Sequence, residues 1–299
     1  RYTEAVMRRT YDATGMTEAA EQAGLALNFD TSHKILSHPA GRLIKRFEVI
    51  TPVVQSDAVI NLCKLKTHLF TGMTGAVKNI FGVVPGLTKP GYHAKLADTR
   101  RFAGMTLDLA DLIRPRLSVM DAVVGMEGDG PNSGTPRPVG WLLASTSPLA
   151  LDVVAGEIMG LPRAQNPLLL EGEERGMSPS NASEVALEGA TLDELRVADY
   201  ALPSVRAAGV GIAQPAWWQQ PVAWLMKQAF TARPVVSDER CVACGACVRA
   251  CPMDVIRLKR TYARIDDSGC IRCYCCHEMC PEDAIDLRTG MLGKMLGRA

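Results

Sequence analysis

The sequence predicts an α/β fold in which a mainly parallel sheet is flanked by helices, followed by a small C-terminal α+β module. Two observations support this prediction. Residues 1–202, the expected α/β domain, alternate between helical patterns and short apolar runs, which is typical of strand–helix units. Nine of the ten cysteines lie between Cys241 and Cys280, which marks the last part of the chain as a separate module.

Two helices and two strands are expected first along the α/β domain. The helical pattern of Thr3–Ala13 resumes at Thr17–Gly24 after a break at Gly15. A β-rich run follows at Arg42–Thr51. The next run, Ala58–Leu62, is apolar enough to predict a buried strand.

Two more helices and two more strands are expected after these. The pattern of Phe102–Ile113 predicts a helix that ends before Pro115, because proline cannot continue a helix. Apolar runs at Leu117–Met120 and Trp141–Ala144 predict buried strands. The last helix is expected over Pro148–Met159, since proline suits the first position of a helix.

Composition and charge exclude several classes of protein. The 299 residues are 47% hydrophobic and 22% charged, which is typical of a globular chain. Lys and Arg number 33 against 32 Asp and Glu, so the net charge of +1 does not attract nucleic acid. No apolar run approaches the ~20 residues of a membrane-spanning helix. We therefore expect no nucleic-acid partner and no transmembrane segment.

Residues 203–235 are expected to form a linker. Three of the four tryptophans lie in it, in a segment that is almost without charge. One interpretation is a linker helix that docks on one or both domains. The other is an apolar patch for a partner or a membrane surface, with residues 216–230 as the contact.

The C-terminal module, expected over residues 236–290 with a tail at 291–299, contains an internal repeat. The spacing C-x2-C-x2-C-x3-C-P begins at Cys241 and returns 29 residues later at Cys270. The same Asp and apolar positions follow each copy, at Asp254 and Asp283 and at Ile256 and Ile285. The module therefore looks like a duplicated unit.

This spacing resembles that of bacterial two-cluster ferredoxins. There, three closely spaced thiolates bind one [4Fe–4S] cluster, and the fourth, followed by Pro, binds the other. The prediction is two [4Fe–4S] clusters. The first ligand set comprises Cys241, Cys244, Cys247 and Cys280. The second ligand set comprises Cys270, Cys273, Cys276 and Cys251.

Other uses of these cysteines fit the pattern less well. Structural zinc sites pair two separated knuckles instead of three cysteines in tandem. Disulfides within such short loops would be strained. Cys275 is additional to both sets and is expected not to be a ligand, and His277 is expected at the surface or behind the ligands.

A cationic segment follows the strand predicted at Ala58–Leu62. It contains Lys64, Lys66, His68 and Lys78 together with three threonines. The carboxyl end of a strand in an α/β sheet is a common ligand site, and these side chains suit an anion or a phosphate. The alternative is structural: Lys64 and Lys66 point outward from the strand end, and His68 caps a helix.

A glycine-rich acidic segment follows the strand predicted at Leu117–Met120. Glu127 and Asp129 suit a hard cation or acid–base chemistry, although such a segment also makes a simple turn. Neighbouring strands would bring these carboxylates to the lysines. Tyr92, His93 and Asp152 are weaker candidates.

Residues 1 to about 200 resemble the family described as domain of unknown function 362. The resemblance lies in the segments NLCKLKTHLFTGMTGAVKNIFGVVPG, YHAKL, MDAVVGMEGDGPNSGTPR and LLASTSPLALD. Members of this family usually begin earlier, with a strand that carries a Lys-Pro-Asn motif, so we expect a first strand–helix unit to be missing before Arg1. Cys63 stands where relatives often have Pro and is not expected to be a ligand.

The resemblance implies an iron–sulfur protein, but it implies no particular reaction. The first hypothesis is an electron-transfer protein whose clusters relay single electrons to or from a site or partner on the α/β domain. The second is an oxidoreductase that acts on an anionic substrate or cofactor in the cleft. The third is a regulatory or assembly protein with structural clusters. We expect a redox partner protein and a cytoplasmic location.

Overall fold

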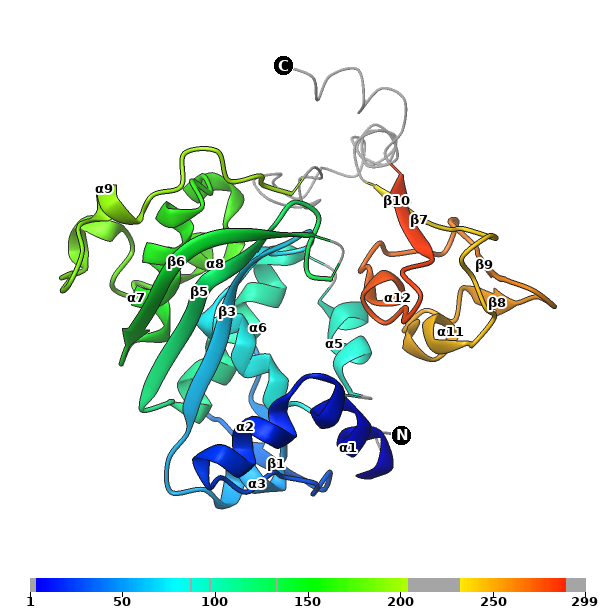
Figure 1. The fold of residues 1–299 in the computed structure, drawn as a ribbon, viewed down its shortest axis with the longest axis horizontal. Coiled ribbons are helices and arrows are strands. Elements are labelled where there is room, and N and C mark those ends of the chain that lie inside the picture. Colours follow the sequence, from blue (N-terminus) through cyan, green and yellow to red (C-terminus); the bar gives the residue numbers. More distant parts are fainter. Residues whose placement is uncertain (1–3, 87, 97, 133, 204–231, 289–299) are drawn as a thin grey trace.

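A computed structural model describes residues 4–86, 88–96, 98–132, 134–203 and 232–288 (Figure 1). Its centre is a sheet of four strands, flanked by helices, in the order β4-β3-β5-β6. These strands are β3 (Ile60–His68), β4 (Gly72–Thr74), β5 (Leu117–Glu127) and β6 (Thr135–Ser145). The α/β fold class is confirmed.

The sheet is mixed, which differs from the mainly parallel sheet expected. β3 and β5 are parallel, whereas β3–β4 and β5–β6 are antiparallel. The short connections between the antiparallel partners explain the difference, because a parallel pair needs a crossover of about a dozen residues or more. Only the connection from β4 to β5, which runs from Thr74 to Leu117, is long enough for such a crossover.

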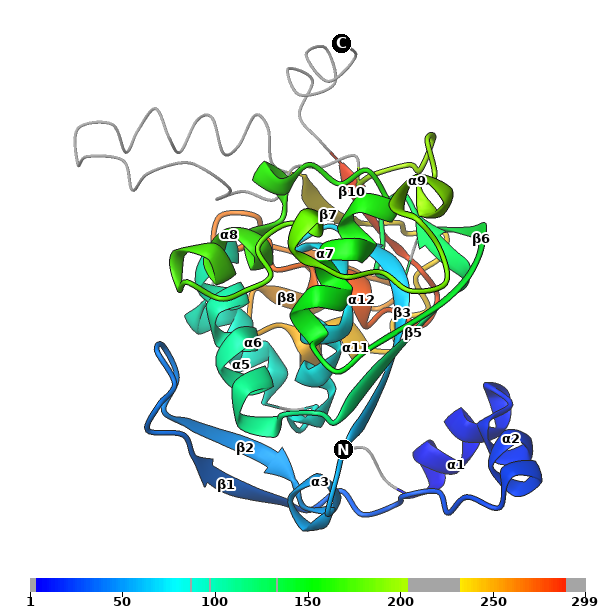
Figure 2. The same cartoon turned by 90° about the vertical axis from the view of Figure 1, so that its left-hand side faces the viewer.

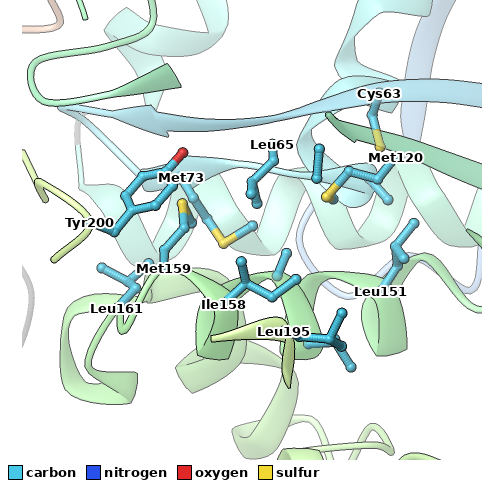
Figure 3. Close-up of a cluster of buried hydrophobic side chains, with 14 residues drawn as sticks. Cys63, Leu65, Met73, Met120, Leu151, Ile158, Met159, Leu161, Leu195 and Tyr200 are labelled. Carbon is cyan, nitrogen blue, oxygen red and sulfur yellow. The ribbon is translucent and has the colours of Figure 1, made fainter. Parts of the chain in front are cut away.

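Helices cover one face of this sheet. α4 (Ala76–Asn79) and α7 (Pro148–Ile158) contact its strands, and α6 (Thr99–Ile113) packs against α4. Figure 3 shows the packing between sheet and helix, where Leu65 and Met120 meet Ile158 in a buried cluster. The opposite face is open, because Leu62 of β3 is 71% exposed. The strand expected to be buried is therefore buried on one face only.

The remaining elements of the α/β domain surround this core. The pair of helices expected at the start of the domain is present and lies at one end of the molecule, together with a β-hairpin (Figures 1 and 2). These elements are α1 (Glu4–Ala13), α2 (Met16–Ala23), β1 (His33–Ser37), β2 (Arg46–Ile50) and α3 (Thr51–Gln55). The others are η1 (Ile80–Val83), α5 (Lys89–Lys95), η2 (Arg163–Gln165), α8 (Pro167–Glu174), η3 (Ala182–Glu184) and α9 (Leu192–Leu195).

The C-terminal module is built from two copies of a strand–helix–strand unit. The first copy comprises β7 (Arg233–Val236), α11 (Ala246–Ala250) and β8 (Ile256–Leu258). The second comprises β9 (Ala263–Ile265), α12 (Cys275–Glu278) and β10 (Ile285–Arg288). Each strand pairs with a strand of the other copy, β7 with β10 and β8 with β9.

The backbone repeats as closely as the sequence does. Left-handed φ angles occur at three pairs of positions that are 29 residues apart: Ala243 and Arg272, Gly245 and Tyr274, and Asp254 and Asp283. The strand registers repeat in the same way, since Ile256 faces Ile265 and Ile285 faces Val236. The internal duplication is therefore structural.

The module packs against the α/β domain. Tyr274 of the second copy is buried in an aromatic cluster of that domain with Phe70, Phe81 and Phe102. Its hydroxyl donates a hydrogen bond to the carbonyl oxygen of Ala232 at 3.0 Å. Figure 1 shows α12 on the side of the module nearest α5.

Within the described ranges, no helix has the length and apolar character needed to span a bilayer. The Trp-rich segment at 216–230 lies outside the described residues, as does the tail expected at 291–299. The expected boundaries of the two domains and the linker stay predictions.

Candidate metal centres and the interdomain site

The second ligand set surrounds one cavity. Cys251, Cys270, Cys273 and Cys276 line a space of about 320 Å³, and most of its other walls are apolar. Three ligands come from one copy and Cys251 comes from the other, as the repeat predicts. A mostly apolar cavity lined by four cysteines fits a [4Fe–4S] cluster, whose protein ligands are cysteine thiolates.

Three members of the first predicted ligand set, Cys241, Cys247 and Cys280, are likewise brought together from both copies. Cys247 is buried, and burial raises the pKa of its thiol, as do the charges of Cys241 and Cys280 nearby. Burial likewise raises the pKa of Cys276, with Cys273 and Cys270 as further causes. Thiolates that repel one another in a buried site become stable when they bind a cationic metal centre.

Backbone amides support some of these sulfur atoms. The N–H of Arg272 donates to Sγ of Cys270 at 3.4 Å, and the N–H of Ala284 donates to Sγ of Cys280 at 3.2 Å. Such bonds stabilise negative charge on sulfur and are one of the means by which proteins tune cluster potentials.

In the described part of the chain, no three or more His, Cys, Asp or Glu side chains are arranged to hold a single metal ion. A cubane does not require such convergence, because each thiolate binds a different iron atom.

Cys275 is buried but does not line the cavity that the second ligand set surrounds. Its thiol is the main cause that lowers the pKa of the neighbouring Cys273. The side chain thus supports a member of the second ligand set. That Cys275 itself is not a ligand stays a prediction. His277 is buried, and its Nδ1 lies 2.6 Å from the carbonyl oxygen of Ile285.

Three of the four cationic candidates, Lys64, Lys66 and His68, lie on a strand and not in a loop, whereas Lys78 lies on α4. β3 continues to His68, because alternate residues of the segment, Leu65 and Thr67, are buried in the core. Lys64 lies on the open face of the sheet and forms an exposed ion pair with Asp121 at 2.6 Å. It takes no part in the site described next.

Lys66, Lys78 and Lys89 surround a carboxylate of the C-terminal module, that of Glu278 on α12. Burial raises the pKa of Glu278, and the charges of these lysines oppose that shift. Burial lowers the pKa of Lys78 to about 8, while Glu278 acts in the opposite direction. The pKa values of Lys66 and Lys89 are lowered for the same main reason.

Two histidines lie beside these charges. His68 is 1% exposed; its Nδ1 accepts a hydrogen bond from the N–H of Phe70 at 3.1 Å, which leaves the proton on Nε2. This Nε2 is 3.4 Å from Oε1 of Glu278. His93 stacks on Phe102 with ring centroids 4.5 Å apart. Burial lowers the pKa of His68 and brings that of His93 to about 3, so both rings are neutral at pH 7.

Of the acidic candidates, Glu127 pairs with an arginine and not with the lysines, which differs from the expected arrangement. Glu127 accepts a hydrogen bond from the N–H of Ala201 at 3.0 Å and lies 3.7 Å from Arg137. Asp129 lies in the loop that joins β5 to β6. In this loop Asn132 donates to the carbonyl oxygen of Glu278 at 2.5 Å, so the loop contacts the C-terminal module.

Glycine is required in this loop at Gly130. The carbonyl oxygen of Gly130 accepts a hydrogen bond from the N–H of Leu69 at 3.0 Å, and a Cβ at this position would lie 2.2 Å from the carbonyl oxygen of Thr67. The loop is thereby held against the end of β3. This contact brings the two candidate segments to one edge of the sheet, as expected.

Asp152 has a structural role. Its carboxylate is buried and accepts hydrogen bonds from the N–H groups of Ala76 at 2.5 Å and Val77 at 3.0 Å. It therefore satisfies the first donors of α4. Burial raises its pKa to about 7.

Sequence reasoning missed Glu278, Lys89 and Asn132. Glu278 lies between two predicted ligands, Cys276 and Cys280, and the cysteine spacing alone gives no indication of a role for the residues between them. The comparison of the two copies contained a usable indication, because Glu278 replaces Arg249 of the first copy. Lys89 and Asn132 lie in or beside turns, and their proximity to Glu278 depends on the packing between domains.

Comparisons with known proteins agree with this geometry. The family model described as domain of unknown function 362 matches residues 2–157, and that of the 4Fe–4S dicluster domain matches residues 240–284. A thylakoid-associated protein of Synechocystis sp. is 40% identical over 153 residues, which cover 51% of this chain and 47% of that protein. The chain thus spans about half the length of the curated relative it matches. It belongs to the family described as domain of unknown function 362, and an iron–sulfur module follows the family domain.

Proposed function

We propose that this iron–sulfur protein carries two [4Fe–4S] clusters and relays single electrons between a redox partner protein and a site on its α/β domain. The observation that carries the proposal is the position of α12: this helix of the second copy contains Cys276 and also holds Glu278 among the lysines of the α/β domain. Bound clusters would supply one-electron chemistry at both ligand sets.

The two ligand sets differ in exposure, and this difference supports an assignment of one set to the redox partner and of the other to the α/β domain. Cys244 of the first set is exposed, so this set is accessible to a partner. Cys273 and Cys276 of the second set are buried, and Tyr274 beside them is part of the α/β core. The partner therefore meets the first set, and the α/β domain meets the second. A cytoplasmic location stays a prediction.

Metal analysis and stepwise reduction test the proposal. Anaerobically purified protein should contain about eight iron and eight sulfide per chain, which is the content of two such clusters. Reduction should develop two EPR signals in separate steps. Zinc in place of iron, or about four iron per chain, would contradict the two-cluster relay.

A second candidate function is that of an oxidoreductase acting on an anionic substrate. It is favoured by the surplus of positive charge around Glu278. Lys66→Ala is the test, because Lys66 is partly exposed and has no ion pair in the described part of the chain. In an enzyme, this variant keeps its iron and its melting temperature but loses turnover. His68→Ala is less suitable than the sequence indicated, since the buried ring would leave a cavity.

A further inference from the structure

The lysines around Glu278 have more positive charge than this carboxylate neutralises. Lys66, Lys78 and Lys89 each interact with Glu278, and within the described ranges it is the one carboxylate whose charge acts on all three. Both neighbouring histidines are neutral. The side chains described here therefore include more lysines than carboxylates at a half-buried place, an arrangement that favours the binding of an anion.

Several buried polar atoms at this place lack hydrogen-bond partners. They are Nδ1 of His93 together with Nε2 of His68 and Oε1 of Glu278, which face each other at 3.4 Å without forming a hydrogen bond. In the part of the chain that the structure describes, the ammonium groups of Lys66 and Lys78 likewise have neither a hydrogen bond nor an ion pair. Buried polar groups are nearly always satisfied, so unpartnered atoms that gather in one place indicate a bound group.

The elements that supply these side chains are rigid. Lys66 and His68 lie on β3, which pairs with both β4 and β5. Lys78 lies on α4, whose first N–H groups are held by Asp152. The loop of Asn132 is fixed to the end of β3 through Gly130. A site built in this way is positioned before a ligand arrives, which favours binding.

We propose that the place where the C-terminal module meets the α/β domain is a binding site for a small oxyanion, a phosphate or a carboxylate. Lys66, Lys78 and Lys89 provide its positive charge, and Nε2–H of His68 provides a directed donor. Glu278 lies beside the ligand and brings α12, with Cys276, next to it. The inference deepens the proposed function, because it assigns a ligand class to the site that the relay serves.

Equilibrium dialysis of the full-length, oxidised protein tests this site with two probes, inorganic phosphate and acetate, each against chloride at matched ionic strength. We expect saturable binding of at least one probe, at one site per chain. Phosphate binding alone assigns a phosphate ligand, and acetate binding alone assigns a carboxylate. No saturable binding of either probe overturns the inference.

Two alanine variants on the same strand provide the matched comparison. Lys66→Ala should weaken binding at least tenfold, whereas Lys64→Ala should leave it within twofold, because Lys64 is paired with Asp121 on the open face. Lys78→Ala is the second variant of the site and should act like Lys66→Ala. Equal effects of Lys64→Ala and Lys66→Ala would show non-specific attraction and would overturn the inference.

Iron content is measured on the same samples. The binding experiment needs no electron transfer, so a protein that binds the anion but contains four iron refutes the two-cluster relay and leaves the oxyanion site intact. A protein with eight iron and no anion binding refutes the oxyanion site and leaves the relay intact. The EPR signal provides a readout near the second ligand set. Phosphate should change the signal of one cluster in the wild type but not in Lys66→Ala.

Discussion

The two copies in the C-terminal module share their backbone but not their environment. Both have a left-handed residue before the helix, Gly245 in the first copy and Tyr274 in the second. Glycine adopts this conformation without strain, whereas for a tyrosine it costs about 1–2 kcal/mol. The first helix has an exposed Arg249 where the second has Glu278 among lysines. The first copy thus faces solvent, and the second faces the α/β domain.

This difference shows how a module of two similar copies contacts the α/β domain through only one of them. The spacing C-x2-C-x2-C-x3-C-P and the strand registers are the same in both copies, so the predicted ligand pattern is duplicated. Among the residues that differ are Gly245 and Tyr274 before each helix and Arg249 and Glu278 within it. Only the second copy therefore contacts the lysines, although the ligand pattern is shared, and the comparison can be tested residue by residue.

The largest effect is expected from Cys276→Ser. A hydroxyl is a poor substitute for a soft thiolate donor, so the variant should lose the second cluster and retain about four of eight iron atoms. Its neighbour is the control: Cys275→Ser should retain eight. Iron analysis and EPR measure both, and equal losses would show that the ligands are wrongly assigned.

The next effect concerns Tyr274. Tyr274→Ala removes a buried ring and keeps the strained backbone, which should cost about 3 kcal/mol, or roughly 10 °C in melting temperature. Tyr274→Gly makes the second copy like the first and should cost about 1 kcal/mol less, since glycine tolerates positive φ. Calorimetry compares the two variants. A glycine variant no more stable than the alanine variant contradicts strain at this position.

Exchange of the helix charges tests docking directly. Glu278→Arg introduces the residue of the first copy beside three lysines and should destabilise the contact between the domains by about 2 kcal/mol. The reverse change in the first copy, Arg249→Glu, should leave the contact intact, because Arg249 is exposed. Limited proteolysis between the domains measures both. Similar cleavage rates in the two variants would refute the asymmetry.

The smallest effect is a pH dependence. Burial lowers the pKa of Lys78 to about 8, below its unfolded value of 10.5, so the unfolded chain binds more protons between these values and stability rises with pH in this window. The gain should be about 2 kcal/mol after allowance for partial exposure. Melting curves from pH 7.5 to ~10.5 should show it in the wild type and not in Lys78→Met. Parallel curves for the two proteins would exclude it.

The sequence predicted what depends on local pattern. Helices such as Phe102–Ile113, the cysteine spacing and the duplication follow from periodicity or repeats, and the structure agrees on each element and on the duplication. The mixed sheet was not predicted, because apolar runs do not reveal strand direction. The proximity of Lys66 to Glu278 was not predicted either, since the two residues are far apart in the sequence and only domain packing brings them near each other.

The crossed pairing of β7 with β10 and of β8 with β9 makes the two copies depend on each other. No strand of either copy finds its partner within that copy, and each predicted ligand set also takes its fourth cysteine from the other copy. A single ancestral copy would therefore satisfy its strands and its clusters only by pairing with a second molecule of itself. In the present chain the two halves supply those partners to each other, so neither half is complete without the other.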